Sequence, residues 1–157
     1  MVMSQLLPYK YIIDTNSILS QKEGEPYRRN VFRTLWSNIE ELITDKSIVM
    51  SQENRIEVED EDIKKWLNSL SIVVLPIDDE IQANVTKVVT TNPKLIDFKE
   101  VKSSGDAFLI ATAMKYGLTV ITEENKRSNK KIPYVCKNLG IPCINLLELC
   151  EKQGWSM

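Results

Sequence analysis

The chain has 157 residues, of which 43% are hydrophobic, so length and composition predict one domain that spans residues 1–157. Its formal net charge is −2 and its isoelectric point is about 5.3. The chain as a whole is therefore not positively charged, and any binding of nucleic acid would need a local basic strip. The sequence contains no histidine, which excludes a Ser-His-Asp triad and a histidine-bound zinc ion.

No apolar run approaches the ~20 residues of a membrane span, and the N-terminal MVMSQLLPYK lacks the basic start and long apolar core of a secretory signal. We therefore expect a cytoplasmic protein without a membrane partner. Cys136, Cys143 and Cys150 are odd in number and have no metal-ligand spacing, so we interpret them as reduced structural thiols. Carboxylates without imidazole or clustered thiolate favour a hard cation, Mg²⁺ or Mn²⁺, if a metal binds.

The first predicted strand, Tyr11–Ile13, is followed directly by the polar run Asp14-Thr15-Asn16-Ser17. These residue types are the common capping residues, so the run alone is more simply a helix N-cap or an Asx turn than a ligand site. It nevertheless puts a carboxylate at the carboxyl end of a strand, where open α/β sheets bind ligands.

Apolar residues recur at helical spacing from Val31 to Ile43 and predict an amphipathic helix. Three arginines lie near its start, namely Arg28, Arg29 and Arg33. They could bind phosphates, but three basic residues near one turn are more often part of a solvated face, so they are weak candidates.

The second predicted strand is Ile48–Met50, and Ser51 is expected to cap one helix that carries Ile56, Ile63, Trp66, Leu67 and Leu70 inward. Charged residues at i, i+3 and i+4 spacing would share one face of that helix: Glu53, Glu57, Asp60, Glu61 and Lys64. Such a face usually contacts solvent, so each of these acids is more simply a surface residue than a ligand.

A third strand at Ile72–Leu75 and a helix at Ile81–Val89 precede a predicted loop at residues 92–103. The next helix begins at Ser103, which has capping-box spacing to Asp106, and ends at Gly117 before a buried strand from Leu118. The helix from Asp106 to Gly117 would be ~17 Å long, and the strand from Leu118 to Thr122 would run back over the same length, ~17 Å. Asp106 and Glu124 should therefore reach the same edge of the sheet.

A basic polar loop follows Glu124 and contains Lys126, Arg127, Lys130 and Lys131. Its position beside the expected edge makes this strip a candidate for binding nucleic acid. The remaining chain predicts an apolar segment from Tyr134 to Leu139, a brief strand from Pro142 to Asn145, and a closing helix from Leu146 to Lys152.

Strands that alternate with helices along the whole chain predict an α/β fold with a mostly parallel sheet and helices on both faces. Asp14, Asp106 and Glu124 then meet at one edge. Like charges held close together are destabilising unless a cation neutralises them, so the three acids together favour a metal site.

Two stretches, YIIDTNS at the first strand and GDAFLIATAMKYGLTVITEE near the end, resemble the PIN-domain ribonuclease superfamily, as does an acid after the second strand. The resemblance covers nearly the whole chain and is closest to the small, single-domain VapC-like toxins. The tail KIPYVCKNLGIPCINLLEL is similar to a little-characterised bacterial branch of that superfamily. The resemblance to the PIN-domain superfamily implies a PIN-like three-layer α/β/α fold.

By this resemblance, Asp14, an intermediate glutamate, Asp106 and Glu124 would hold one or two Mg²⁺ or Mn²⁺ ions. Thr15, Asn16, Ser17 and Thr122 would orient the ions or their waters. Glu57 is our choice for the intermediate acid, with Glu53 or Glu59 as alternatives. The implied reaction is hydrolysis of RNA phosphodiester bonds, in which Lys126, Arg127, Lys130 and Lys131 would offset backbone charge. A protein antitoxin and a homodimer are the implied partners.

Two other functions fit the same residues. An aspartyl-phosphate phosphatase also begins with an aspartate after the first strand, but it usually has a second aspartate where this chain has Asn16. A catalytically silent PIN-like module would bind RNA or a protein without cutting. A receiver-like signalling domain fits less well, because its phosphoacceptor is expected on a later, central strand. Metal-dependent RNA cleavage distinguishes the ribonuclease from the silent module.

Overall fold

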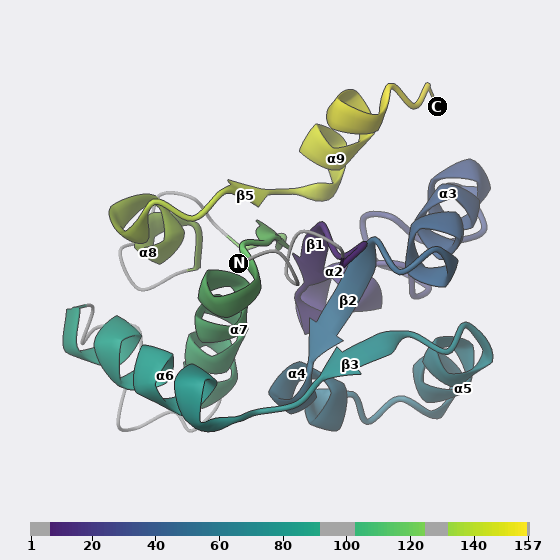
Figure 1. Ribbon diagram of the computed structural model, residues 1–157. Coiled ribbons are helices and arrows are strands. Elements are labelled where there is room, and N and C mark those ends of the chain that lie inside the picture. Colours follow the sequence, from purple (N-terminus) through teal and green to yellow (C-terminus); the bar gives the residue numbers. More distant parts are fainter. Residues whose placement is uncertain (1–6, 92–102, 125–131, 157) are drawn as a thin grey trace.

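The computed structural model describes residues 7–91, 103–124 and 132–156, which form an α/β fold around one parallel sheet (Figure 1). Its five strands lie in the order β3-β2-β1-β4-β5, and their bounds are β1 Tyr11–Ile13, β2 Ile48–Ser51, β3 Val73–Leu75, β4 Thr119–Ile121 and β5 Cys143–Ile144. The helices are α2 Thr15–Leu19, α3 Arg33–Thr44, α4 Gln52–Glu57, α5 Glu61–Ser69, α6 Asp79–Thr91, α7 Ser103–Tyr116, α8 Ile132–Leu139 and α9 Leu146–Gln153. The predicted fold class is confirmed.

Helices cover both faces of the sheet because successive strand side chains point to opposite faces. Ile13 of β1 packs in one core with residues of α3, α5 and α9, whereas the adjacent Ile12 packs in a second core with residues of α6, α7 and α8. The two groups of helices lie on opposite sides of the sheet in Figure 1. Every residue of β1 and β2 is buried, which is why these strands read as continuous apolar runs.

The single helix predicted after Ser51 is wrong, because the chain forms two helices there. Ser51 does cap α4, since its Oγ accepts a hydrogen bond from Asn54 N at 3.2 Å. Val58 then leaves the helix in an extended conformation and is 2% exposed, and Asp60 starts α5 by accepting from Ile63 N at 2.9 Å. Ile56, predicted to point inward, is 64% exposed.

This break also means that Glu53, Glu57, Asp60, Glu61 and Lys64 do not share one helical face. Burial of Val58 and the side-chain cap from Asp60 outweigh helix continuity here. The acids near β2 therefore have to be assigned individually.

The other predicted elements are present with shifted ends. The segment from Tyr134 to Leu139 lies in α8. Of the loop predicted at 92–103, residues 92–102 lie outside the described residues, and Ser103 is the first residue of α7. The three cysteines are free thiols, with Cys136 and Cys150 buried. In the part of the chain that the structure describes, no helix has the length and apolarity needed to cross a membrane.

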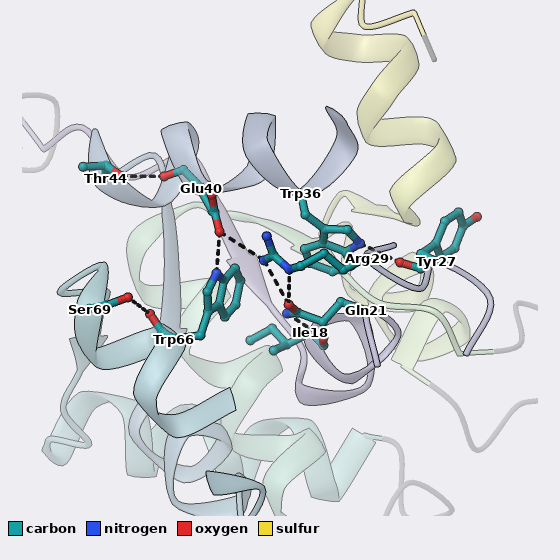
Figure 2. A network of polar contacts seen from close by, with 9 residues as sticks. All are labelled: Ile18, Gln21, Tyr27, Arg29, Trp36, Glu40, Thr44, Trp66 and Ser69. Atoms are coloured by element: carbon teal, nitrogen blue, oxygen red, sulfur yellow. Dashed lines mark hydrogen bonds and ion pairs between the residues drawn. The ribbon is translucent and has the colours of Figure 1, made fainter. Parts of the chain in front are cut away.

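Arg29 lies at the centre of a polar network between the α2–α3 segment, α3 and α5 (Figure 2). Its guanidinium donates to Gln21 Oε1 at 3.1 and 3.0 Å and pairs with Glu40 Oε2 at 3.0 Å. It also lies 6.0 Å from the ring centre of Trp36 and 5.4 Å from that of Trp66. Arg29 is thus occupied within the fold, which leaves Arg28 and Arg33 as the exposed members of the arginine group.

Arg29→Ala is expected to lower the melting temperature by about 3–6 °C. The substitution removes charge-assisted hydrogen bonds and two cation–π contacts at a half-buried site, which together are worth about 1.5 kcal/mol. Scanning calorimetry measures the shift. The matched control is Arg28→Ala, which removes one exposed hydrogen bond to Glu25 O and should change stability by less than about 0.5 kcal/mol. Equal shifts for the two variants would contradict this role of Arg29.

Candidate metal centre

The carboxyl ends of β1 and β4 lie side by side, since Ile13 pairs with Ile121. Asp14 follows β1 directly, and Thr122 follows β4. Asp106 is in the first turn of α7, the helix that leads into β4. These connections bring the carboxylate oxygens of Asp14, Asp106 and Glu124 within 4.8 Å of one another. The structure therefore brings together the three acids that the sequence predicts at one edge.

Asp14 occupies the N-cap position of α2 but does not act as a capping residue. Its backbone is extended, with φ −78° and ψ 151°, and its side chain makes no capping hydrogen bond. Asp14 Oδ2 instead accepts from Thr122 Oγ1 at 2.9 Å, across the two strand ends. The carboxylate also interacts with the backbone of Thr15, so it lies between the start of α2 and the end of β4.

The environment of Asp14 opposes its ionisation. The residue is 4% exposed, and its pKa is raised from 3.8 to about 7, first by burial and then by the negative charge of Glu124. Glu57 adds a smaller repulsion, while the hydrogen bond from Thr122 partly offsets the increase. A bound cation would reverse this effect, because it favours the charged form of each carboxylate around it.

Thr122 and Asn16 fix the two strand ends to each other. Thr122 is 2% exposed, and besides donating to Asp14 its Oγ1 accepts from Glu124 N at 3.3 Å. Asn16 Oδ1 accepts from Glu123 N at 3.2 Å. The backbone that carries Glu124 is therefore held in position by side chains of both strand ends.

Glu124 also contacts the start of α8. Its Oε1 accepts from Ile132 N at 3.0 Å, so one carboxylate oxygen satisfies an otherwise unpaired amide at a helix N-terminus. Its neighbour Glu123 does the same for α9, since Glu123 Oε2 accepts from Leu146 N at 2.8 Å. The second carboxylate oxygen of Glu124 is therefore available to bind a cation while the first keeps its hydrogen bond to the start of α8.

Glu57, the last residue of α4, lies beside the three clustered acids. Its pKa is raised, first by partial burial of the carboxyl group and also by Glu53 and Glu124, while a hydrogen bond from Asn54 opposes the increase. Asn54 Nδ2 donates to Glu57 Oε1 at 2.7 Å. Glu57 and Glu59 are both exposed as whole residues, and Glu59 lies beyond the end of α4. Of the three alternatives for the intermediate acid, Glu57 has charge interactions with both Asp14 and Glu124.

The remaining predicted polar residues have local structural partners. Thr15 Oγ1 donates to Asn54 O at 3.2 Å, and the buried Ser17 Oγ lies 3.4 Å from Ile121 O. Both contacts join α2 to neighbouring elements around the acids. The basic strip, Lys126, Arg127, Lys130 and Lys131, lies outside the described residues.

Sequence reasoning missed Asn54 and Gly105, which both contact Glu57. Asn54 precedes Glu57 by three residues, a spacing that puts two side chains on one face of a helix. That spacing was a usable signal. Gly105 gave none, because its contact joins residues 48 positions apart, as the difference of their numbers shows.

One family model matches residues 11–157, and its description is "Domain of unknown function (DUF4411)". No curated protein sequence matches the chain.

Solved structures share the fold at low sequence identity. FitAcB from Neisseria gonorrhoeae has a TM-score of 0.52 and 19% identity over 87% of this chain and 98% of that one. FitAB bound to an IR36 DNA fragment has a TM-score of 0.54 and 16% identity over 87% of this chain and 94% of that one. DNA-bound VapBC from Salmonella typhimurium has a TM-score of 0.52 and 18% identity over 88% of this chain and 98% of that one. These similarities identify the fold as PIN-like.

Proposed function

This chain belongs to the DUF4411 family, and from its PIN-like fold and its carboxylate cluster we propose that it is a metal-dependent endoribonuclease. The observation that carries the proposal is the mutual approach of Asp14, Asp106 and Glu124, whose carboxylate oxygens lie within 4.8 Å of one another. They come from three separate elements, after β1, in α7 and after β4. One cation can contact all three and would offset the repulsion between their negative charges.

The donor set suits Mg²⁺ or Mn²⁺. Asp14, Glu57, Asp106 and Glu124 offer only oxygen atoms, which hard divalent cations prefer, and the chain has no histidine to favour zinc. The burial that raises the pKa of Asp14 to about 7 is also what a bound cation would counteract. The residues present therefore fit such an ion.

When bound, the metal would lower the pKa of a water and polarise the scissile phosphate for in-line displacement. The protein's part is then to hold its own groups in position. Thr122 would keep the Asp14 carboxylate oriented through its 2.9 Å hydrogen bond, and Asn16 would keep the backbone before Glu124 in place. Glu57 would supply the fourth carboxylate. No nucleophilic side chain is required.

RNA is the proposed substrate, and the basic strip at Lys126, Arg127, Lys130 and Lys131 would bind its backbone. In the sequence this strip begins two residues after Glu124. Its four positive charges would add attraction for a polyanion on a chain whose net charge is −2. An aspartyl-phosphate phosphatase is less well supported, because Asn16 takes the place of its second aspartate and accepts from Glu123 N.

A protein antitoxin is the proposed partner. The resemblance of the sequence to VapC-like toxins implies such a partner, and solved structures that share this fold include FitAB bound to a DNA fragment and DNA-bound VapBC. By this likeness the chain would be the toxin of a cytoplasmic toxin–antitoxin pair and would form a homodimer. Co-purification with the product of an adjacent small gene would support the pairing.

The test of the proposed reaction is cleavage of RNA by the purified protein with Mg²⁺ or Mn²⁺. We expect internal cuts in single-stranded or structured RNA, complete loss of cutting in excess EDTA, and recovery when Mn²⁺ is restored. Gel analysis of end-labelled RNA measures all three. Asp14→Asn, purified in parallel, controls for contaminating nuclease.

Two results would contradict the proposal. Undiminished cleavage by the wild type in EDTA would exclude metal-assisted hydrolysis. Binding of Mn²⁺ and RNA with no cleavage would instead support the silent PIN-like module.

A further inference from the structure

Two residues that have no part in the predicted acid cluster lie against the carboxylate of Glu57. Asn54 Nδ2 donates to Glu57 Oε1 at 2.7 Å. Gly105, immediately before Asp106 in the first turn of α7, lies next to the same oxygen. These two contacts determine where the charge of Glu57 lies relative to the other acids.

Gly105 provides the space that Glu57 occupies. A Cβ atom at this position would overlap Glu57 Oε1 and would lie 3.0 Å from Cδ and 3.3 Å from Oε2. Gly105 is helical and is not among the glycines with positive φ, which are Gly24, Gly117, Gly140 and Gly154. Alanine would be the better residue for the backbone of a helix, so the absence of a side chain serves the neighbouring carboxylate.

Asn54 is fixed so that its amide reaches Glu57. The residue is fully buried, its backbone N donates to Ser51 Oγ, and its backbone O accepts from Thr15 Oγ1. Its Oδ1 is buried and has no hydrogen-bond partner among the described residues, although buried polar atoms are normally paired. A buried amide with an unpaired oxygen is destabilising. The side-chain hydrogen bond that Asn54 does make, from Nδ2 to Glu57 Oε1, is a reason for its presence.

We propose that Gly105 and Asn54 position the Glu57 carboxylate as the fourth acid of the metal centre, Gly105 by leaving room for it and Asn54 by donating one hydrogen bond. This inference rests on the proposed function, since it requires that the acids bind a cation. Both are positioning residues, because each acts through Glu57. Together they connect α4 to the start of α7 at the point where Asp106 enters the cluster.

The decisive variant is Gly105→Ala. The atoms that a new Cβ meets are at the end of a flexible side chain, so Glu57 can rotate away while the fold is retained. We expect the melting temperature in EDTA to stay equal to that of the wild type or to rise. The dissociation constant for Mn²⁺, measured by calorimetry, should increase by at least about 10-fold, the lower end of the effect of losing a residue that orients a ligand.

Glu57→Ala provides the matched background. With the Glu57 carboxylate absent, Gly105→Ala and Asn54→Ala should each change Mn²⁺ affinity by less than about 2-fold, because additivity fails when two residues act through one group. Asn54→Ala in the wild-type background should weaken Mn²⁺ binding by about 10-fold. A merely structural role for either residue would give the same loss in both backgrounds.

The outcomes separate this inference from the proposed function. Tight Mn²⁺ binding by the wild type and equally tight binding by Gly105→Ala would overturn the positioning role and leave the metal centre standing. Losses that persist in the Glu57→Ala background would also overturn it. A wild type that does not bind Mn²⁺ at millimolar concentration would overturn both.

Discussion

Asp14→Asn and Asp106→Asn are each expected to lower RNA cleavage by more than about 100-fold, because changes to residues that only orient metal ligands already cost 10–100-fold. Asparagine keeps the size of the side chain but removes the negative charge that a hard cation requires. The three carboxylates lie within 4.8 Å of one another, so the loss of one cannot be replaced by a more distant acid. Initial rates at saturating Mn²⁺ measure the effect.

The glutamates near β2 supply matched controls for these two variants. Glu57→Gln should reduce the rate strongly, whereas Glu53→Gln and Glu59→Gln should have weak effects. Glu59 lies beyond the end of α4, and Glu53 acts on the centre through its charge on Glu57, which itself interacts with Asp14 and Glu124. If Glu59→Gln is the damaging change, the assignment of the intermediate acid is wrong.

The arrangement of the acids could be predicted from local patterns alone. A buried strand followed by a polar residue, and a helix that returns through a short strand, both define which end of the sheet a side chain reaches. Asp14, Asp106 and Glu124 were found in this way because each lies within one or a few residues of a recognisable element end. Such signals do not depend on contacts between distant segments.

The break between α4 and α5 could not be predicted in the same way. The apolar spacing of Ile56, Ile63 and Leu67 fits one continuous helix, yet Ile56 is 64% exposed. What decides the structure is the burial of Val58 in the core that α3 and α5 share, a tertiary contact that outweighs local helix preference. The position of Glu57 depends on this break, so the sequence left three candidates for the intermediate acid.

The role of Arg29 could not be predicted from the sequence for the same reason, since it depends on tertiary contacts. In the sequence it is one of three arginines near a helix start, equivalent to Arg28 and Arg33. Its partners, Gln21 and Glu40, come from opposite sides of it along the chain, and the aromatic rings that flank it belong to α3 and α5. A residue type alone could not distinguish an ion pair inside the fold from a phosphate contact.

In EDTA, Asp14→Asn is expected to be more stable than the wild type, and its advantage should grow with pH. The pKa of Asp14 is raised from 3.8 to about 7 in the folded protein, chiefly by burial and by Glu124. Folding therefore favours the protonated form. The stability that this form provides is fully present below the unfolded pKa and is lost as pH rises through the folded pKa.

Between about pH 5 and about pH 8 this loss amounts to about 3 kcal/mol for the wild type, from a slope of 1.36 kcal/mol per unit over the range where only the folded state holds the proton. Asparagine does not titrate, so the variant should not lose this stability as pH rises. The gap between the two melting temperatures should widen by about 5–10 °C over this range. Scanning calorimetry at the two pH values in EDTA measures it.

Mg²⁺ should narrow the difference in stability between the two proteins. At about 20 times its dissociation constant the ion would add about 1.8 kcal/mol to the wild type, or about 4–7 °C, because the cation relieves the repulsion that Asp14 feels from Glu124 and Glu57. The asparagine variant should gain much less, since it lacks one of the three clustered carboxylates. Glu59→Gln, which changes an exposed acid outside the cluster, should gain as much as the wild type. A wild type whose melting temperature is the same with Mg²⁺ and with EDTA would contradict the metal centre and favour the silent module.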